Sequence, residues 1–412
     1  MAVAQDNVRD VPYNAPDDVH QGVVVKTNST LNIALQNQTS SSTVYAYITG
    51  LAIDNNNALF LLQADGKTPY YPSSPSSTLS PLGVNCAIAL GAPGNTVTAT
   101  IPHLAGARLW FSQDSTLAFS LNPGPALVEP SSTNKSDPNY NKYWDFCEFT
   151  FNSNQLFANI SYVDFVCLPI SLTLQNTSGG TQHVSGLPSN GLNTVCSGLV
   201  AQNAQDGAGW DQLVVTLNGA NLRALSPNSG IAMNSSLFSG YYQPYVNAVW
   251  SQYTGNALQV DTQASFGTVS GTVSNGQLTF AGVGSYTQPS SADIFSCSSG
   301  PFSPTGNTEK DAITARLAAS CNRSTLLLNV VHPDGESISN YYKYAITNHY
   351  SRICHSTNLD GRGYGFPYDD VSPSSSSSDQ SGSISDPNPQ LLTVAVGGAN
   401  AFASKKREGG RP

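Results

Sequence analysis

The sequence predicts a mainly β protein, a β-sandwich or β-barrel, that carries one inserted mixed α/β domain. Three observations lead to this prediction. Short stretches rich in β-branched and aromatic residues follow one another between residues 31 and 119, separated by Gly, Pro, Asn and Ser, as is typical of sandwiches and barrels. Helical patterns are confined to residues 191–355, and a last strand-like segment, LLTVAVGG, follows a Ser-rich run near the end.

The length of the chain bears on its division into domains. With 412 residues, it fits either two domains or one large β domain with an insertion. We expect four consecutive parts: the first part of the β domain at 1–190, a mixed α/β domain at 191–355, a return to the β domain with a Ser-rich loop at 356–400, and a disordered tail at 401–412.

Six strands are expected before residue 120. Their sequences are LNIALQNQ, TVYAYITGLAI, ALFLLQADG, CAIALG, NTVTATIPHL and ARLWFS. Residues 72–82 and 122–142 are rich in Pro, Ser and Asn, which predicts two surface loops.

A β-hairpin over residues 143–168 is expected to carry the candidate functional side chains. YWDFCEFTF and ANISYVDFVCL favour strands, and the polar residues 152–155 favour a turn between them. If the turn is centred near Leu156, Glu148 stands opposite Asp164 on one face of the sheet.

Side-chain alternation gives this hairpin a polar face and an apolar face. Thr150 and Asn152 share the face of Glu148. Cys147 and Asp145, a third acid of this hairpin and an alternative to Glu148, fall on the apolar face. The polar face therefore presents two carboxylates to solvent in front of a core.

Three helices are expected in the mixed domain. The first lies in the stretch from Gln243 to Thr254, with Pro near its first turn and Gly255 just past its end. The second begins with a capping box at 308–311, and the third covers 339–354. The residues expected to face the core are Val246, Val249, Trp250 and Tyr253 in the first helix, Ile313, Leu317 and Cys321 in the second, and Tyr342, Ile346, Tyr350 and Ile353 in the third.

The composition points to an extracellular protein. Charged residues make up only 10% of the chain, against about 25% in average domains. The net charge of −9 and the pI near 5.0 argue against binding to nucleic acid or an anionic membrane. No window of about 18 apolar residues occurs, and residues 1–18 lack the apolar core of a secretion signal. We expect a secreted monomer whose signal peptide is absent from this sequence.

The cysteines and histidines bear on redox state and metal binding. We favour disulfides over buried free thiols for an extracellular protein, with connectivity left open. The six histidines show no ligand spacing, so we expect no metal and no other cofactor. The seven cysteines, which allow at most three disulfides, are Cys86, Cys147, Cys167, Cys196, Cys297, Cys321 and Cys354.

Two carboxylates that face each other on a solvent-exposed sheet surface have two interpretations. Glycoside hydrolysis needs such a pair, since one carboxylic acid donates a proton to the leaving oxygen while a carboxylate activates water or attacks carbon. Alternatively, Glu148 and Asp164 are solvated residues on an exposed sheet face. The pattern alone leaves both interpretations open.

Several segments of the chain resemble glycoside hydrolase family 64, the β-1,3-glucanases with a thaumatin-like barrel. The carboxylates of DFCEFTF and ISYVDFV stand 16 residues apart, as in the family's catalytic hairpin. The other similar segments are TATIPHLAGARLWFS, LRALSP, YYQPYVNAVWSQY, DGRGYGFPYDDV and LLTVAVGG. The resemblance implies a wide groove between barrel and mixed domain, and an endo-acting, anomer-inverting hydrolase that releases short laminari-oligosaccharides.

The resemblance also implies roles for single residues. Glu148 matches the general acid and Asp164 the general base. Tyr364 is a further candidate for the groove because its loop carries two matching acids. The expected substrate-binding residues are Thr150, Asn152, Phe157, Ser161, Tyr364, Asp369, Asp370 and Asp137.

Two residues of the hairpin conflict with this assignment or constrain it. Ser161 has rear parity in the assumed register, so its place in the groove requires a bulge or another register. Asn159, in the sequon Asn-Ile-Ser, has the same parity and would point into the core, so we expect it to be unglycosylated.

The implied partner is a β-1,3-glucan of the fungal or plant cell-wall type. A rival hypothesis is a non-catalytic thaumatin-like protein that binds glucan or acts against fungi without hydrolysis. A third is a structural cell-wall protein, which the low-charge composition favours and the pair of acids disfavours.

Overall fold

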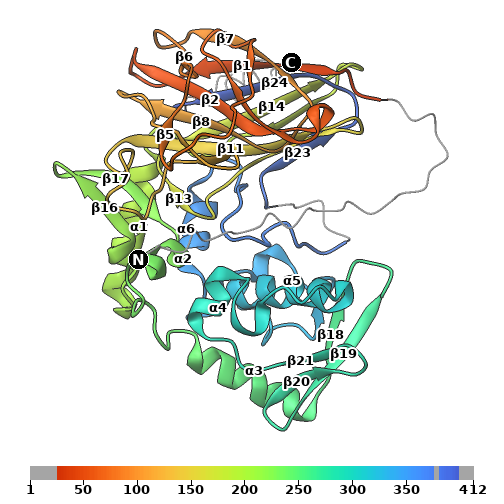
Figure 1. The fold of residues 1–412 in the computed structure, drawn as a ribbon. Helices are drawn as coiled ribbons and strands as arrows, with labels where there is room; N and C mark the ends of the chain where they lie inside the picture. The colour runs from red at the N-terminus through yellow and green to blue at the C-terminus, as the bar shows by residue number, and fades with distance from the viewer. Residues whose placement is uncertain (1–25, 375–379, 399–412) are drawn as a thin grey trace, which may run out of the picture.

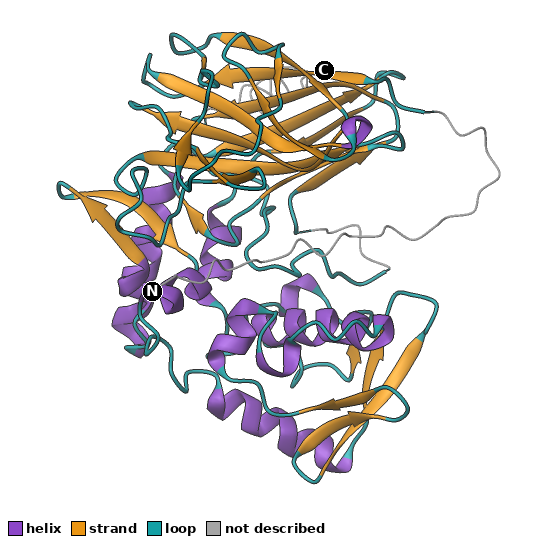
Figure 2. Cartoon of the chain, in the orientation of Figure 1, coloured by secondary structure: helices purple, strands orange, loops and turns teal. Residues whose placement is uncertain are grey.

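The computed structural model describes residues 26–374 and 380–398; the tail expected at 401–412 lies outside them. Figure 1 shows a β-rich part above a part that combines helices with smaller sheets. The secondary-structure view in Figure 2 shows the same separation, with nearly all helices in the lower part. The prediction of a mainly β protein is confirmed.

Two large sheets stack in the upper part (Figure 1). In spatial order, the larger sheet contains β23 (Ser383–Asp386), β12 (Leu156–Ile160), β11 (Tyr143–Phe151), β8 (Leu104–Gln113), β2 (Val44–Ala52), β3 (Ala58–Leu62) and β4 (Pro69–Tyr70), with β6 (Ile88–Ala89) paired to β2. The second contains β15 (Thr181–Val184), β14 (Ile170–Asn176), β24 (Pro389–Val396), β1 (Thr30–Asn37) and β7 (Thr96–Pro102). Across the described residues both sheets are open, so the fold is a sandwich and not a closed barrel.

The sandwich core lies between the two sheets. Strand β24 pairs in parallel with β1 and antiparallel with β14, so the end of the chain joins the sheets formed by its first part. Alternating residues of β1 such as Ile33 and Leu35 are fully buried, because one face of each sheet covers the other. A small sheet of β10 (Ala126–Val128), β9 (Ser120–Asn122) and β5 (Ser80–Pro81) lies beside them.

The lower part combines helices with two further sheets. One sheet contains β13 (Phe165–Val166), β17 (Ala220–Leu225) and β16 (Val214–Leu217), and the other β21 (Gly284–Tyr286), β20 (Gln277–Phe280), β19 (Thr268–Ser274), β18 (Leu258–Asp261) and β22 (Val331–His332). The α-helices are α1 (Gly191–Asp206), α2 (Pro227–Met233), α3 (Gln243–Gly255), α4 (Ser291–Ser296), α5 (Thr308–Arg323) and α6 (His349–Thr357). The 3-10 turns are η1 (Ile53–Asn55), η2 (Trp210–Leu213), η3 (Gly300–Phe302) and η4 (Ile338–Asn340).

The helix predictions were right in two cases and wrong in the third. Helices α3 and α5 bury the apolar residues expected of them. The cap of α5 is one residue earlier than expected, because the Asn307 side chain accepts the N–H groups of Glu309 and Lys310. The third helix begins only at His349, since the chain before it takes a positive φ of 59° at Tyr342 and Asn348 caps the new start.

The expected disulfides are absent from the structure. All seven cysteines, each of them in the described part of the chain, are free and buried. Each side chain fills core space as a small apolar group. Within the described residues, helices are too short or too polar to cross a membrane.

Candidate active site

The register of the β11–β12 hairpin differs from the expected one. The turn falls at residues 152–155 as predicted, but Glu148 pairs with Asn159 and not with Asp164. The partner is thus five residues earlier, and an odd shift moves every side chain of β12 to the other face of the sheet. The assumed turn centre near Leu156 placed the axis of the hairpin too far along the chain.

The corrected register settles which side chains share the face of Glu148. Phe157 stands opposite Thr150 on that face, and both are partly exposed. Ser161 now has the parity of Glu148, so no bulge is needed to bring it there. Asn159 also lies on this face and is 8% exposed, which corrects its expected position in the core behind the sheet.

Asp164 reaches the same face through β13 and not through the hairpin. The ring of Phe165 packs against Trp144 and Phe146, with centroid distances of 4.7 and 6.2 Å. These two aromatic residues lie on the Glu148 face of β11 by alternation. The backbone of Asp164 is fixed from the lower part, because the N–H of Ser226 donates to its carbonyl oxygen at 2.9 Å.

Asp164 is exposed to solvent, and its carboxyl group is also partly desolvated. Its side chain is exposed to solvent, yet desolvation by the surrounding protein raises the pKa of the carboxyl, while the positive charge of Arg108 opposes the rise. An exposed carboxylate can accept hydrogen bonds from a water molecule.

Arg108 is a residue of this site that the sequence analysis missed. It stands directly opposite Glu148 in the β8–β11 pairing, and its Nε lies 3.3 Å from Oε1 of Glu148. Its Nη1 lies 2.6 Å from Oε2 of Glu129. One arginine therefore links Glu148 to Glu129 and acts electrostatically on Asp164. The signal in the sequence was a lone charge within the apolar strand ARLWFS.

The segment around Tyr364 extends the same sheet face. Tyr364 forms a parallel bridge with Ser161, its N–H donates to Ile160 at 3.0 Å, and its carbonyl accepts from Tyr162 at 2.7 Å. Tyr364 is partly exposed, whereas the nearby Phe366 is 2% exposed and belongs to the core.

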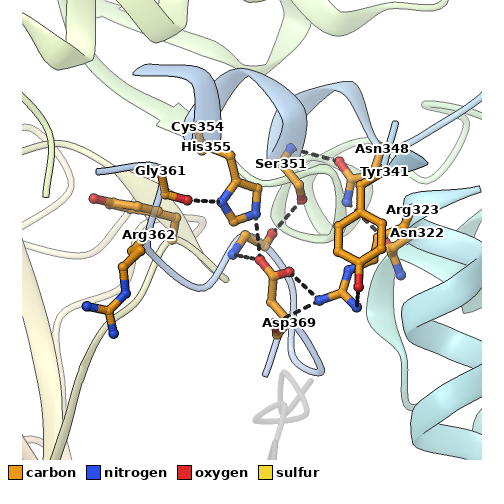
Figure 3. A network of polar contacts seen from close by, with 12 residues as sticks. Asn322, Arg323, Tyr341, Asn348, Ser351, Cys354, His355, Gly361, Arg362 and Asp369 are labelled. Carbon is orange, nitrogen blue, oxygen red and sulfur yellow. Dashed lines mark hydrogen bonds and ion pairs between the residues drawn. The ribbon is translucent and has the colours of Figure 1, made fainter. Parts of the chain in front are cut away.

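Asp369 lies away from solvent, which corrects its expected contact with substrate. Its side chain is fully buried in the network drawn in Figure 3, 3.0 Å from Nη2 of Arg323 and 2.8 Å from Nε2 of His355. Burial disfavours its charge, but His355, Arg323 and the N–H of Gly365 together lower its pKa. Asp369 therefore ties the 361–371 loop to helices α5 and α6.

Asp370 is only partly buried, and its environment differs from that of Asp369. Desolvation raises the pKa of its carboxyl, and the neighbouring charge of Asp369 adds to the rise. Of the two adjacent acids, Asp370 is the one still accessible at the surface.

Asn152 and Asp137 both stabilise local turns. Oδ1 of Asn152 accepts the N–H groups of Asn154 and Gln155 at 2.9 and 3.0 Å, so only its amide group is available for a ligand. Oδ1 of Asp137 accepts the N–H of Asn139 at 2.7 Å. The structure gives both residues a structural task besides any contact with substrate.

The remaining acid and the tryptophans are core residues. Asp145 is buried as expected, accepts N–H groups of Phe146, Cys167 and Leu168, and has its pKa raised to about 7 by burial. Trp110 and Trp144 are each 1% exposed. Groups of three or more His, Cys, Asp and Glu side chains that could hold a metal do not occur among the residues described.

A family model described as β-1,3-glucanase, glycoside hydrolase family 64, matches residues 29–396. This match spans most of the chain, so the chain belongs to glycoside hydrolase family 64. Its curated relatives include two glucan endo-1,3-β-glucosidases. That of Cellulosimicrobium cellulans is 28% identical over 325 residues, and that of Arthrobacter sp. (strain YCWD3) is 27% identical over 325 residues. Each alignment covers 76% of this chain and 56% of the relative, so the chain spans about half the length of these relatives.

Solved structures show the same fold. A laminaripentaose-producing β-1,3-glucanase in complex with laminaritetraose superposes with a TM-score of 0.79 at 29% identity, over 89% of this chain and 98% of that chain. A β-1,3-glucanase domain from Clostridium beijerinckii superposes with a TM-score of 0.70 at 22% identity, over 89% of this chain and 98% of that chain. The second likeness concerns the fold alone.

Proposed function

We propose that this chain is an endo-acting β-1,3-glucan hydrolase that inverts the anomeric carbon, with Glu148 as general acid and Asp164 as general base. The observation that supports the proposal most is that both acids interact with Arg108. Glu148 contacts this arginine, and Asp164 lies within its electrostatic reach. The substrate class follows from the family and from the glucan endo-1,3-β-glucosidases among the relatives.

The two acids differ in ways that suit separate roles. Asp164 is accessible to water, as a base that deprotonates an attacking water must be. Glu148 stands on the regular part of β11, from which it would donate its proton to the departing glycosidic oxygen. An inverting pair leaves about 6.5–9.5 Å between the carboxyl groups so that water fits between base and sugar.

The neighbouring side chains would bind the glucan chain. Phe157 and Tyr364 are partly exposed rings, and such rings pack on the apolar faces of sugars. Polar contacts are assigned to Thr150, Asn152, Ser161, Asp370 and Asp137. Asp369 keeps an indirect role, because it holds the loop that carries Tyr364 and Asp370.

Further properties belong to this proposal as well. They are a thaumatin-like β domain of residues 1–190 and 356–400, a mixed domain of residues 191–355, and a wide groove between them. Secretion, which the low share of charged residues supports, and a monomeric state also belong to it.

The deciding experiment compares Glu148→Gln and Asp164→Asn with the wild type on laminarin and curdlan. Loss of a general acid or base lowers turnover by about 10²- to 10⁴-fold, while the melting temperature should stay unchanged. Glu309→Gln, at the start of α5, is the matched control. Near wild-type turnover in either active-site variant would refute its role, and a first product with retained anomeric configuration, seen by proton NMR, would refute inversion.

The rival function is glucan binding without hydrolysis. It predicts that the wild type is pulled down by curdlan and releases no soluble oligosaccharide. The same assay therefore separates the two hypotheses.

A further inference from the structure

Glu129 and Glu148 both contact Arg108, on the face of the sheet that carries Glu148. The chain contains only five glutamates, Glu129, Glu148, Glu309, Glu336 and Glu408, and two of them contact Arg108. Glu129 comes from the segment after β10 and not from the hairpin that carries Glu148. The side chains of Glu129, Arg108 and Glu148 are 31%, 29% and 33% exposed, so the three groups are partly shielded from water.

Aromatic rings fix the guanidinium between the two carboxylates. Its central carbon lies 4.9 Å from the ring centroid of Phe146 and 5.6 Å from that of Trp110. Arginine stacks favourably on such faces. Because the cation is held in place, the strength of its electrostatic effect on each glutamate depends on the distance between the two groups.

The contacts of Arg108 with the two glutamates are unequal. The distance to Glu129 is 2.6 Å and that to Glu148 is 3.3 Å. Charge-assisted N–H···O bonds are usually about 2.7–2.9 Å long, so the contact with Glu129 is a strong one and that with Glu148 is weak. Arg108 therefore binds Glu129 more strongly than Glu148.

This inequality matters for a residue that must carry a proton. A nearby arginine favours the ionised form of a carboxyl group, whereas a general acid has to stay protonated until the sugar binds. An arginine paired with Glu148 alone would oppose that task. Glu129 reduces the opposition because its negative charge offsets the positive charge of Arg108.

We propose that Glu129 is a positioning residue for the acid: it holds Arg108 so that Glu148 keeps its proton available for the departing oxygen. The inference rests on the proposed function only for the identity of the acid. The charged or titratable groups around Glu148 that enter it are Arg108 from β8, Glu129 from the segment after β10, Asp164 from the segment before β13, and the thiol of Cys147 next to Glu148 on β11.

Glu129→Gln tests the proposal because it keeps the shape and removes the charge. The alkaline limb of the kcat/KM profile on laminarin, where the acid loses its proton, should move to lower pH by roughly one unit, the lower end of the effect of a neighbouring charge. Glu309→Gln is the matched control and should leave the profile unchanged. In an Arg108→Gln background, Glu129→Gln should shift the limb little, since its effect acts through the arginine.

A second readout does not depend on activity. With glutamate labelled by ¹³C at the side-chain carboxyl, the protein gives at most five carboxyl signals, and Glu148→Gln identifies the one of interest. The titration midpoint of this signal should fall by the same amount in Glu129→Gln. An unchanged or higher midpoint overturns the proposal even if the protein hydrolyses no glucan, whereas a lower midpoint without hydrolysis supports it and refutes the proposed function.

Discussion

The ring of Phe165 packs edge-on against Trp144, with the ring centroids 4.7 Å apart. Phe165 belongs to β13, which pairs with β17, whereas Trp144 belongs to β11 of the large sheet. The contact therefore fixes the residue before Phe165, which is Asp164, over the sheet face that carries Glu148. Apolar packing thus holds the segment before β13, which contains Asp164, against the large sheet.

Phe165→Leu should lower kcat more than it lowers stability. The smaller side chain leaves space against Trp144, so Asp164 is less precisely placed, and misplacement of a reacting group by about 1 Å costs up to 10²-fold in rate. We expect roughly a tenfold loss of kcat on laminarin, with KM little changed. Phe149→Leu, on the buried face of β11, should destabilise the fold without this loss of kcat. Equal effects of the two substitutions on kcat would show that the ring does not position Asp164.

The same substitution should have different effects at the two adjacent acids of the 361–371 loop. Asp369→Asn breaks a fully buried ion pair with Arg323 and should lower the free energy of unfolding by about 3–5 kcal/mol. Asp370→Asn, at a partly exposed position, should leave stability nearly unchanged and raise KM for glucan. Urea denaturation and laminarin kinetics measure the two effects. Comparable stability losses in both variants would contradict this division of roles.

The sequence predicted the local parts of the site better than their assembly. The faces of β11 were predicted correctly because alternation depends only on neighbouring residues. The pairing of Glu148 was wrong, since four polar residues at 152–155 allow more than one turn axis, and only the folded hairpin shows that Asn152 closes it. The position of Asp164 depends on Phe165 packing against Trp144 and on Ser226, 62 residues later, so no local pattern carries it.

Buried charges were the other limit of prediction from sequence. Asp369 and Asp370 are identical in type and adjacent, yet one is inside the protein and the other at its surface. The difference arises from Arg323 and His355, whose helices meet the loop only in the folded chain. Arg108 was overlooked because a single arginine in a strand gives no hint of the carboxylates beside it.

The seven thiols should be unreactive in the folded protein. All are buried and unpaired with one another, and desolvation raises the pKa of several, that of Cys86 to about 11 and that of Cys321 to about 12. A thiol reagent should modify none of them in the native state and all seven in guanidinium chloride. Reduction with dithiothreitol should leave the melting temperature unchanged. Fewer than seven reactive thiols in the denatured, unreduced protein would reveal a disulfide.

The acid limb of the activity profile should report the environment of Asp164. A general base must be ionised, and desolvation raises the pKa of Asp164 above the usual value, which is about 3.9 for aspartate. Activity should therefore fall, as pH is lowered, at a higher pH than an ordinary aspartate would give. Arg108 lowers this pKa, so Arg108→Gln should move the acid limb to still higher pH. Arg352→Gln, on α6, removes a cation that bonds to Gln202 and should leave the limb in place. A limb that moves to lower pH in Arg108→Gln would mean that Asp164 is not the group that titrates there.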